Sequence, residues 1–394
     1  MSPARMTVTE ILEKLIAFDS VSSRSNLTII RWISDYLAGH GIKAEIIEAP
    51  GGEPKANPPK ANLWASVGPD RDGGIVLSGH TDVVPVEGQP WSSDPFILKD
   101  GGDRWFGRGT SDMKGFIALS LALVPEMLKR ELKTPLHFAF SYDEEVGCLG
   151  APNMLAEIGK RFRKPRIAII GEPTELKLGT RHKGCYSFTT TVTGRDGHSS
   201  QPERGLNAIF AAAEVATELG RIYDRLRHDG PFDKSFDPPH STINLGRING
   251  GTAVNIIARS CSIEWDFRGV PGVTPTAVLE SLERFVETDL LPRLKTAAPE
   301  ATVITKPRVA VPPLVEEHDG AAETLLRLLT GQNDSFGMSF ATEAGQFQSA
   351  GLSAIVCGPG SIRQAHQPDE FIMKDQLEAG EALLRRVIDW AEKN

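Results

Sequence analysis

The stretch LHFAFSYDEEVGCLG, residues 136–150, combines the pattern of a buried strand with an acidic turn. Its first half is an apolar run of the length and composition typical of a buried strand. Three carboxylates follow at once, Asp143, Glu144 and Glu145, before the chain turns at glycines. Because adjacent carboxylates repel one another at the end of a buried strand, the sequence predicts positive charge opposite them. The alternative is a solvated acidic loop, which the preceding apolar run disfavours.

Length and composition indicate a globular protein with more than one core. The chain has 394 residues, too many for one ordinary core and enough for two domains. Hydrophobic residues make up 40% and charged residues 24%, which is a normal soluble balance. The formal net charge of −8 argues against nucleic acid or an anionic membrane as the main partner.

Cysteine usage and the N-terminal segment predict a cytoplasmic location. The four cysteines lie far apart and form no CxxC pair, so a disulfide framework or a thiolate zinc site is not expected. The first 18 residues contain no apolar signal core and are expected to form a short tail and an amphipathic helix. No segment reaches the roughly 18 apolar residues of a membrane span.

Strand and helix patterns alternate over residues 1–182 and resume after residue 313. This alternation predicts an α/β domain with a mostly parallel central sheet flanked by helices. Pro125 is expected to kink the third helix. Strands are expected at 43–49, 61–68, 73–82, 136–142, 166–171 and 352–360, and helices at 7–18, 27–41, 114–130, 150–158, 321–331 and 375–393.

Residues 183–312 follow a different order and predict a second domain inserted into the first. The order βαββαβ is that of a ferredoxin-like α+β unit. Asn249-Gly250-Gly251 is a hairpin signal between its two middle strands. The strands are expected at 186–194, 241–249, 260–269 and 301–311, and the helices at 207–226 and 276–294.

The motif His80-Thr81-Asp82 follows the apolar run IVLSG. Residues two apart in an extended strand point to the same face, so His80 can bind a metal while Asp82 holds its ring. A satisfied polar pair at a strand end is the alternative for this motif alone. In the acidic run, Glu144 and Glu145 cannot point in one direction from an extended chain, so one can bind metal while the other faces the substrate.

Three further residues of metal-binding type lie near predicted strand ends. Asp112 lies in the Gly-rich GRGTSDMKG, Glu172 ends the apolar strand of IIGEPTE, and His366 follows the strand SAIVCG. Singly, Asp112 also suits a helix cap and His366 a surface loop. Ligands of parallel sheets gather at the carboxyl ends of strands, and mixed imidazole and carboxylate ligands suit zinc better than magnesium or calcium. Five ligand groups exceed what one tetrahedral zinc needs, so two metals with a bridging carboxylate are expected.

A series of stretches resembles, in chain order, the motifs of the co-catalytic dizinc aminoacylase and deacylase metallopeptidases. That family includes succinyl-diaminopimelate desuccinylase and glutamate carboxypeptidase-type enzymes. The resemblance runs from the first helix to the last, and TSDMKGF, RHKGCYSF and GPGSIRQAHQPDEF are most similar to one deacetylase branch. The stretches are SGHTDVVP, GRGTSDMKG, DEEVGCLGA, GEPT, GRDGHSSQPERGLNAI and GPGSIRQAHQPDE.

The resemblance implies a role for each candidate residue of the first domain. It implies two zinc ions, with cobalt as the other suitable metal, and a cis peptide after Asp112. The family's motifs assign His80 and Glu172 to one metal, Glu145 and His366 to the other, Asp112 to both, Asp82 to orienting His80, and Glu144 to the general base.

The resemblance also implies that the inserted domain is a lid and a dimerisation unit. His198 is then expected to reach the active site of the partner subunit and stabilise the oxyanion. Asn255 and Arg268 resemble positions that line the cleft and bind the substrate carboxylate. The chain departs from many relatives at Ala258, where they carry proline. Taken alone, His198 also suits an ordinary turn and Arg268 a solvated strand end.

The activity implied is hydrolysis of an N-acyl amino acid, a small-molecule substrate. The nearest rivals use the same chemistry as a desuccinylase, a general aminoacylase or a carboxypeptidase. A non-catalytic binding protein of the same fold is a different class of rival, but every expected ligand and the base are present. A single-metal protein is a third rival, which metal analysis of the purified protein distinguishes.

Overall fold

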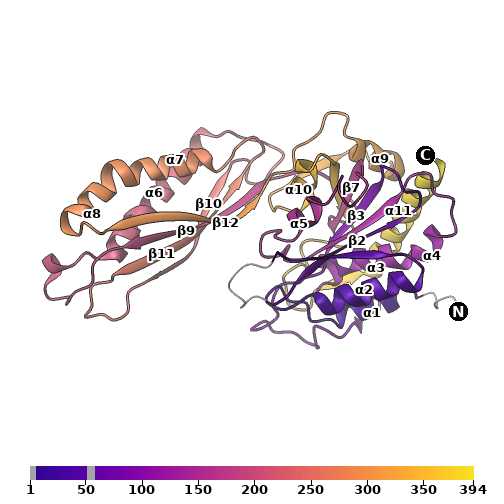
Figure 1. The fold of residues 1–394 in the computed structure, drawn as a ribbon, viewed down its shortest axis with the longest axis horizontal. Coiled ribbons are helices and arrows are strands. Elements are labelled where there is room, and N and C mark those ends of the chain that lie inside the picture. Colours follow the sequence, from indigo (N-terminus) through magenta and orange to yellow (C-terminus); the bar gives the residue numbers. More distant parts are fainter. Residues whose placement is uncertain (1–5, 51–57) are drawn as a thin grey trace. The chain divides into compact units, whose positions relative to one another are not determined.

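The computed structural model describes residues 6–50 and 58–394 and divides into two compact units (Figure 1). Unit 1 comprises Met1–Arg181, Leu314–Gly337 and Thr342–Asn394. Unit 2 comprises His182–Pro313 and Met338–Ala341. The chain therefore leaves unit 1, builds unit 2, and returns to complete unit 1.

Unit 1 is built on an eight-stranded sheet with the order β1-β2-β6-β3-β7-β14-β8-β13. Neighbours among the four central strands run parallel, which confirms the predicted mostly parallel centre. β3, β6 and β7 are buried at every position, as continuous apolar runs in a parallel sheet require. The strands are β1 (Ala44–Glu48), β2 (Ala61–Val67), β6 (Leu136–Ser141), β3 (Ile75–His80), β7 (Ile167–Pro173), β14 (Ser353–Gly358), β8 (Leu178–His182) and β13 (Ser335–Met338).

Antiparallel pairing occurs towards the edges of this sheet. β1 pairs with β2, β2 with β6, and β14 with β8 in the antiparallel sense. β8 and β13 are short and lack a continuous apolar run, so the sequence does not predict them.

Helices cover both faces of the sheet. One hydrophobic core joins the sheet to α1 (Val8–Ile16), α2 (Leu27–Gly39), α3 (Gly115–Ala122), α9 (Ala321–Thr330) and α11 (Lys374–Lys393). Every residue of α3 is buried, since α1 and α11 pack against it and it packs on β3 and β7. α5 (Ala151–Leu155) and α10 (Ala344–Ser349) contact each other on the other face (Figure 1).

The helix predicted over 114–130 is interrupted. The π-helical segment η1 (Thr110–Lys114) leads into α3, and the short helix α4 (Val124–Met127) follows it. Pro125 lies in the first turn of α4, where a residue without an N–H is tolerated. The predicted kink is therefore a break between two helices.

A second, three-stranded sheet in unit 1 was not predicted. It has the order β15-β5-β4, with β4 at Lys99–Asp100, β5 at Arg104–Phe106 and β15 at Phe371–Met373. The antiparallel pair of β15 and β5 brings the segment after His366 beside the segment before Asp112. This small sheet therefore helps to place two predicted ligands together.

Unit 2 has the predicted ferredoxin-like order βαββαβ. Its antiparallel sheet has the order β10-β11-β9-β12, and its helices share one core with the sheet. The elements are β9 (Gly184–Thr193), α6 (Ala208–Asp229), β10 (Thr242–Gly250), β11 (Ser260–Gly269), α7 (Thr276–Phe285) with its continuation η3 (Val286–Leu290) and α8 (Leu291–Ala297), and β12 (Thr302–Val311).

The hairpin predicted at Asn249-Gly250-Gly251 is only partly correct. β10 and β11 pair as expected, but Asn249 and Gly250 lie inside β10, where Gly250 pairs with Cys261. The connection is the longer segment 251–259. A tight turn at the asparagine would have ended β10 before this pairing.

None of the helices in residues 6–50 and 58–394 combines the length and the apolar character that crossing a membrane requires.

Candidate metal centre

The carboxyl ends of the four parallel strands meet at one edge of the sheet, and the predicted ligands gather there. His80 is the last residue of β3, and Glu172 lies near the end of β7. Glu145 follows β6, and His366 lies in the segment after β14. Asp112 reaches the same place from η1, at the start of the buried helix α3.

The five side chains form two groups that share one residue. The ligand atoms of His80, Asp112 and Glu172 lie within 4.8 Å of one another, as do those of Asp112, Glu145 and His366. Asp112 turns one oxygen to each histidine: Oδ1 is 3.0 Å from Nε2 of His80, and Oδ2 is 3.3 Å from Nε2 of His366. Its carboxylate therefore has the geometry of a bridge between two sites.

The outer members of each group complete this arrangement. Glu172 Oε1 lies 3.7 Å from Nε2 of His80. Glu145 Oε2 lies 2.9 Å from Nε2 of His366. His80, Asp112 and Glu172 are buried, whereas the side chain of His366 is 53% exposed. The second group is therefore the one that opens to solvent.

Burial makes this collection of charges costly in the absence of a counter-charge. Burial raises the pKa of the Glu172 and Glu144 carboxyls well above their ordinary range. Burial, together with the charge of Asp112, raises the pKa of Glu145 to about 7. Hydrogen bonds to Asp112 and Glu145 raise the pKa of His366 to about 10. These raised pKa values mean that the cluster favours bound protons or other positive charge.

These residues fit two divalent cations. Imidazole and carboxylate donors together suit zinc and neighbouring transition metals, and one carboxylate can bridge two such ions. Divalent charge offsets the repulsion among the buried carboxyls. The peptide between Asp112 and Met113 is cis, as the resemblance implies.

Asp82 contacts the ring of His80, as expected, and it does so from just beyond the end of β3. β3 ends at His80, so Asp82 lies beyond the strand. Nδ1 of His80 donates to the main-chain carbonyl of Asp82 at 2.9 Å, which leaves Nε2 of the neutral ring as the nitrogen that can bind metal. The Asp82 carboxylate lies 3.7 Å from Nδ1 of the same ring, and it also accepts the main-chain N–H groups of Glu144 at 3.1 Å and Glu145 at 3.3 Å.

Asp143, the first of the three adjacent carboxylates, has a specific role in this turn. It adopts a left-handed backbone conformation with φ of 55°. Its carboxylate accepts from Nζ of Lys60, which also donates to the carbonyl of Ser22. Both side chains are largely buried. This ion pair ties the acidic turn to the segment before β2, and sequence spacing alone contains no signal for it.

Two other unpredicted residues lie close to the candidate base. The thiol of Cys148 donates to Oε1 of Glu144 at 3.4 Å. Glu343 is only 1% exposed, accepts a long hydrogen bond of 3.5 Å from Ser78, and has its pKa raised to about 7 by burial. Nothing in the sequence TEAG distinguishes Glu343 from an ordinary carboxylate at a helix start.

The three candidates in the inserted domain lie on unit 2, whereas the metal-binding cluster lies entirely on unit 1. His198 is exposed, and its Nδ1 accepts from the N–H of Ser200 at 3.1 Å. His198 and Asn255 lie near each other, since Ser199 donates to the Asn255 carbonyl. Arg268 is elsewhere on unit 2, on β11, where it donates to Asp266 at 3.0 Å.

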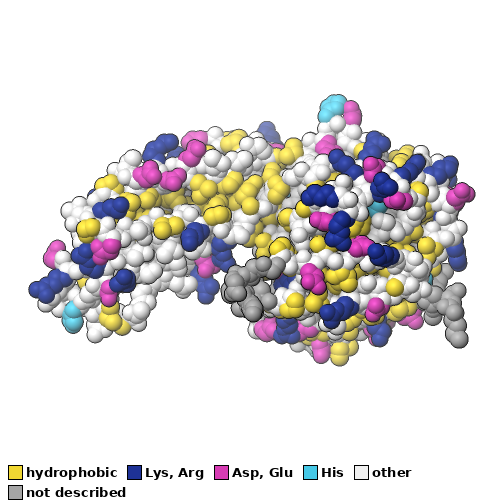
Figure 2. Space-filling model, viewed as in Figure 1, with side chains coloured by type: hydrophobic (Ala, Val, Ile, Leu, Met, Phe, Trp, Pro, Cys, Tyr) yellow, Lys and Arg dark blue, Asp and Glu magenta, His cyan; other side chains and the backbone are white. Residues whose placement is uncertain are grey.

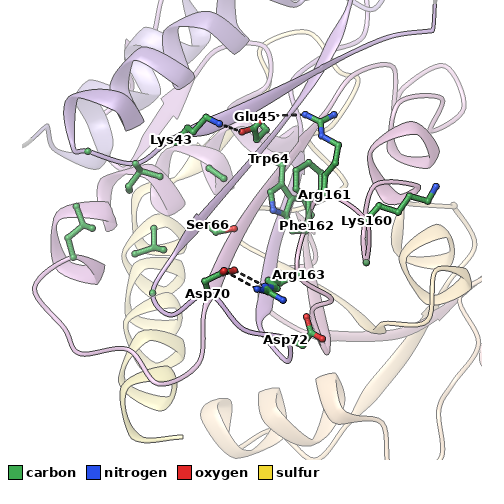
Figure 3. A pocket seen from close by; sticks show the side chains of 17 residues that line it. Lys43, Glu45, Trp64, Ser66, Asp70, Asp72, Lys160, Arg161, Phe162 and Arg163 are labelled. Atoms are coloured by element: carbon green, nitrogen blue, oxygen red, sulfur yellow. Dashed lines mark hydrogen bonds and ion pairs between the residues drawn. The ribbon is translucent and has the colours of Figure 1, made fainter.

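Unit 1 also has a hollow of about 760 Å³ that is separate from the candidate metal centre (Figure 3). None of the metal-binding candidates is among the residues that line it. Its charged side chains pair with one another: Arg163 with Asp70 at 2.8 Å, and Arg161 with Glu45 at 3.1 Å. Since these charges are largely satisfied, the hollow offers no set of converging groups for a ligand.

Comparisons with known proteins identify the family of this chain. Residues 76–390 match the family described as "Peptidase family M20/M25/M40". The chain is 35% identical to acetylornithine deacetylase of Proteus mirabilis (strain HI4320) over 391 residues, 97% of this chain and 96% of that protein.

Two solved structures show the same fold at low sequence identity. The dipeptidase Dug1p of Saccharomyces cerevisiae superposes with a TM-score of 0.75 at 17% identity, covering 98% of this chain and 96% of that one. The YXEP protein of Bacillus subtilis, described as a dinuclear metal binding peptidase, superposes with a TM-score of 0.63 at 15% identity and covers 98% of each chain.

Proposed function

This chain belongs to the peptidase family M20/M25/M40 and is a metal-dependent amidohydrolase, and on that premise we propose that it deacetylates N2-acetyl-L-ornithine. The products are L-ornithine and acetate, a step of arginine biosynthesis. The deacetylase branch that TSDMKGF, RHKGCYSF and GPGSIRQAHQPDEF resemble is that of the acetylornithine deacetylases. The observation that carries the chemistry is the carboxylate of Asp112, with one oxygen facing each histidine.

We assign the residues of the cluster to two zinc ions, and cobalt is the other metal that these donors suit. His80 and Glu172 hold one ion, Glu145 and His366 hold the other, and Asp112 belongs to both. The support for this division is that each group already places its ligand atoms within 4.8 Å of one another.

Glu144 is proposed as the general base and acid. When bound, the two ions supply Lewis acidity to the reacting water and to the acyl carbonyl. The Glu144 carboxylate takes a proton from the water, whose oxygen attacks the acyl carbon. As the carbon–nitrogen bond breaks, Glu144 returns that proton to the departing α-amine. Its place next to Glu145, with both main-chain N–H groups held by Asp82, supports this role.

Unit 2 is proposed as the lid and dimerisation domain, corresponding to the predicted range 183–312 and leaving 1–182 and 313–394 as the catalytic domain. β10 is an edge strand of its sheet, and hydrophobic side chains lie exposed on and near it. The exposed residues of this apolar patch are Ile209, Phe210, Ile248, Val254 and Ile256. A second copy of the chain is the occupant that makes a homodimer.

Three residues of unit 2 are proposed to act on the substrate. Nδ1 of His198 accepts from Ser200, so the ring proton lies on Nε2. That N–H can donate to the oxyanion of a substrate bound in the active site of the partner subunit. Asn255 and Arg268 are proposed to line the cleft and bind the substrate carboxylate.

The surface and the cysteines support a cytoplasmic enzyme that binds neither nucleic acid nor membranes. Basic and acidic side chains alternate over the face shown in Figure 2. No disulfide joins the four cysteines, which all lie within residues 58–394.

The base assignment is tested by the variant Glu144→Gln. Glutamine keeps the size of the side chain but cannot accept the proton, so turnover should fall by about 10²-fold to 10⁴-fold. Metal content should remain at two equivalents per chain, measured by elemental analysis. Glu131→Gln, at an exposed carboxylate of unit 1, is the matched control. Full activity in Glu144→Gln would show that another group moves the proton.

Substrate identity is tested with N-acetyl-ornithine, N-succinyl-diaminopimelate, N-acetyl-methionine and a glutamyl peptide. We expect the highest kcat/KM with N-acetyl-ornithine. A clear preference for the second, third or fourth compound would identify a desuccinylase, a general aminoacylase or a carboxypeptidase, with the same roles for the cluster.

A further inference from the structure

His366 has a main-chain contact outside the cluster that bears on its position. It is the most exposed of the five side chains and lies in the loop between β14 and β15, with φ of 64°. Its main-chain carbonyl accepts a hydrogen bond from Nε2 of Gln89 at 2.9 Å. Gln89 belongs to a different loop, between β3 and β4, and is half-buried.

The orientation of the Gln89 amide is determined by its other neighbours. Its oxygen accepts from Nη2 of Arg108 at 2.6 Å and from Nε1 of Trp91 at 3.1 Å. Both of those groups can only donate. The amide nitrogen must therefore face the remaining partner, the carbonyl of His366, and the opposite orientation would place oxygen against oxygen.

Arg108 links this contact to the bridging ligand. Its guanidinium is 1% exposed and donates to Glu370 at 2.7 Å. The Glu370 carboxylate, equally buried, accepts the main-chain N–H groups of Ser111 at 2.9 Å and Asp112 at 3.0 Å. One connected set of hydrogen bonds thus runs from the main chain of His366 to the main chain of Asp112.

We propose that Gln89 is a positioning residue that holds His366 in place for the second metal group, with Arg108 and Glu370 as its support. The inference rests on the metal centre of the proposed function. Gln89 acts on the main chain of His366 and touches no ligand atom. Its loss should therefore weaken binding to the group Asp112, Glu145 and His366 while sparing the group His80, Asp112 and Glu172.

The fold should tolerate a change at Gln89. A second tie between the same two loops remains, because the N–H and hydroxyl of Ser92 both donate to Asp369, at 2.9 and 3.0 Å. The Arg108–Glu370 pair also remains. A variant at Gln89 thus changes one contact of the His366 loop rather than its attachment.

Two substitutions distinguish the role of the amide nitrogen from that of the amide oxygen. Gln89→Ala removes both ends. Gln89→Glu keeps an oxygen for Arg108 and Trp91 but replaces the donor with a second oxygen, which faces the His366 carbonyl. Gln364→Ala is the matched control: Gln364 is half-buried in the same loop as His366, and its side chain makes no hydrogen bond with any residue in 6–50 or 58–394.

The experiment titrates Zn²⁺ into the metal-free full chain in competition with a chelator and resolves the two binding steps. Circular dichroism and melting temperature confirm that each variant is folded. We expect Gln89→Ala and Gln89→Glu to weaken one of the two steps by about tenfold or more, the usual effect of losing a partner that orients a ligand. The other step should be unchanged, and Gln364→Ala should resemble the wild type.

The outcomes distinguish the inference from the proposed function. If Gln89→Glu binds both ions as the wild type does, the contact with His366 is unimportant and the inference is wrong, while the metal centre stands. If both steps weaken equally, Gln89 acts on general stability, which also refutes the inference. A wild-type chain that binds fewer than two equivalents refutes the metal centre and this inference with it.

Discussion

Replacing Lys60 with methionine removes the only cation that contacts Asp143 among the described residues. The side chains of Lys60 and Asp143 are 8% and 14% exposed, so water can replace little of the lost interaction. Breaking a buried ion pair by removing one partner costs about 3–5 kcal/mol. The slight exposure favours the lower end, about 3 kcal/mol. A domain of the size of unit 1 loses about 2–4 °C per kcal/mol, so the melting temperature should fall by about 6–12 °C.

A double-mutant cycle separates the pair from each residue alone. Thermal unfolding is followed by circular dichroism for Lys60→Met, Asp143→Asn and the double variant. The double variant should be more stable than Lys60→Met, because no unpaired carboxylate remains buried. A Lys60→Met melting temperature within about 1 °C of the wild type, or strictly additive effects in the cycle, would refute the reasoning.

The deficit should also depend on pH. Burial raises the pKa of Asp143 even beside Lys60, and loss of the cation raises it further. The folded variant then binds the proton more tightly than the unfolded chain does, so its stability falls as pH rises through the range above the unfolded value of about 3.9. The melting deficit should be full at neutral pH and smaller near pH 4.5. An equal deficit at both pH values would contradict this account.

Metal removal and the apolar patch of unit 2 lead to two further predictions. Dialysis against a chelator should abolish hydrolysis and lower the melting temperature, because the buried carboxyls lose the charge that offsets their repulsion. Two equivalents of Zn²⁺ should restore both the activity and the melting temperature. Full recovery after one equivalent would indicate a single-metal enzyme. Ile248→Asp and Val254→Asp should each convert the dimer to a monomer, as measured by light scattering. Ile304→Asp, on the opposite edge strand β12, should remain a dimer. Dimers in all three variants would place the interface elsewhere.

The sequence was sufficient to predict the strand ends that carry the candidate metal-binding residues. The runs that form β3, β6, β7 and β14 are apolar enough to be predicted as central strands. The carboxyl ends of parallel strands lie at one edge of the sheet. His80 and Glu172 at that edge were therefore predictable as neighbours, although they are far apart in the chain. The same reasoning placed the two glutamates after β6.

The contacts that hold those residues in place were not predictable. Gln89 and Lys60 act through groups that approach only after the chain has folded, and neither shows periodicity or a motif. Asp82 illustrates the limit: its contact with His80 was predictable, but β3 ends at His80 and the Asp82 carboxylate also binds the main chain of the next loop. The short strands β8 and β13 were not predicted because tertiary pairing, rather than local composition, stabilises them.

The insertion of unit 2 delays completion of the catalytic centre during synthesis. Glu145 and His366 are 221 residues apart in the chain. At about 5–20 residues per second, a ribosome needs about 10–45 s to pass from one to the other. For most of that interval the central sheet lacks β14, and until its end the second group lacks its histidine. A nascent chain thus exposes the vacant edge of β7 until β14 (Ser353–Gly358) has been synthesised, and it acquires hydrolytic capacity only after the inserted unit has been made.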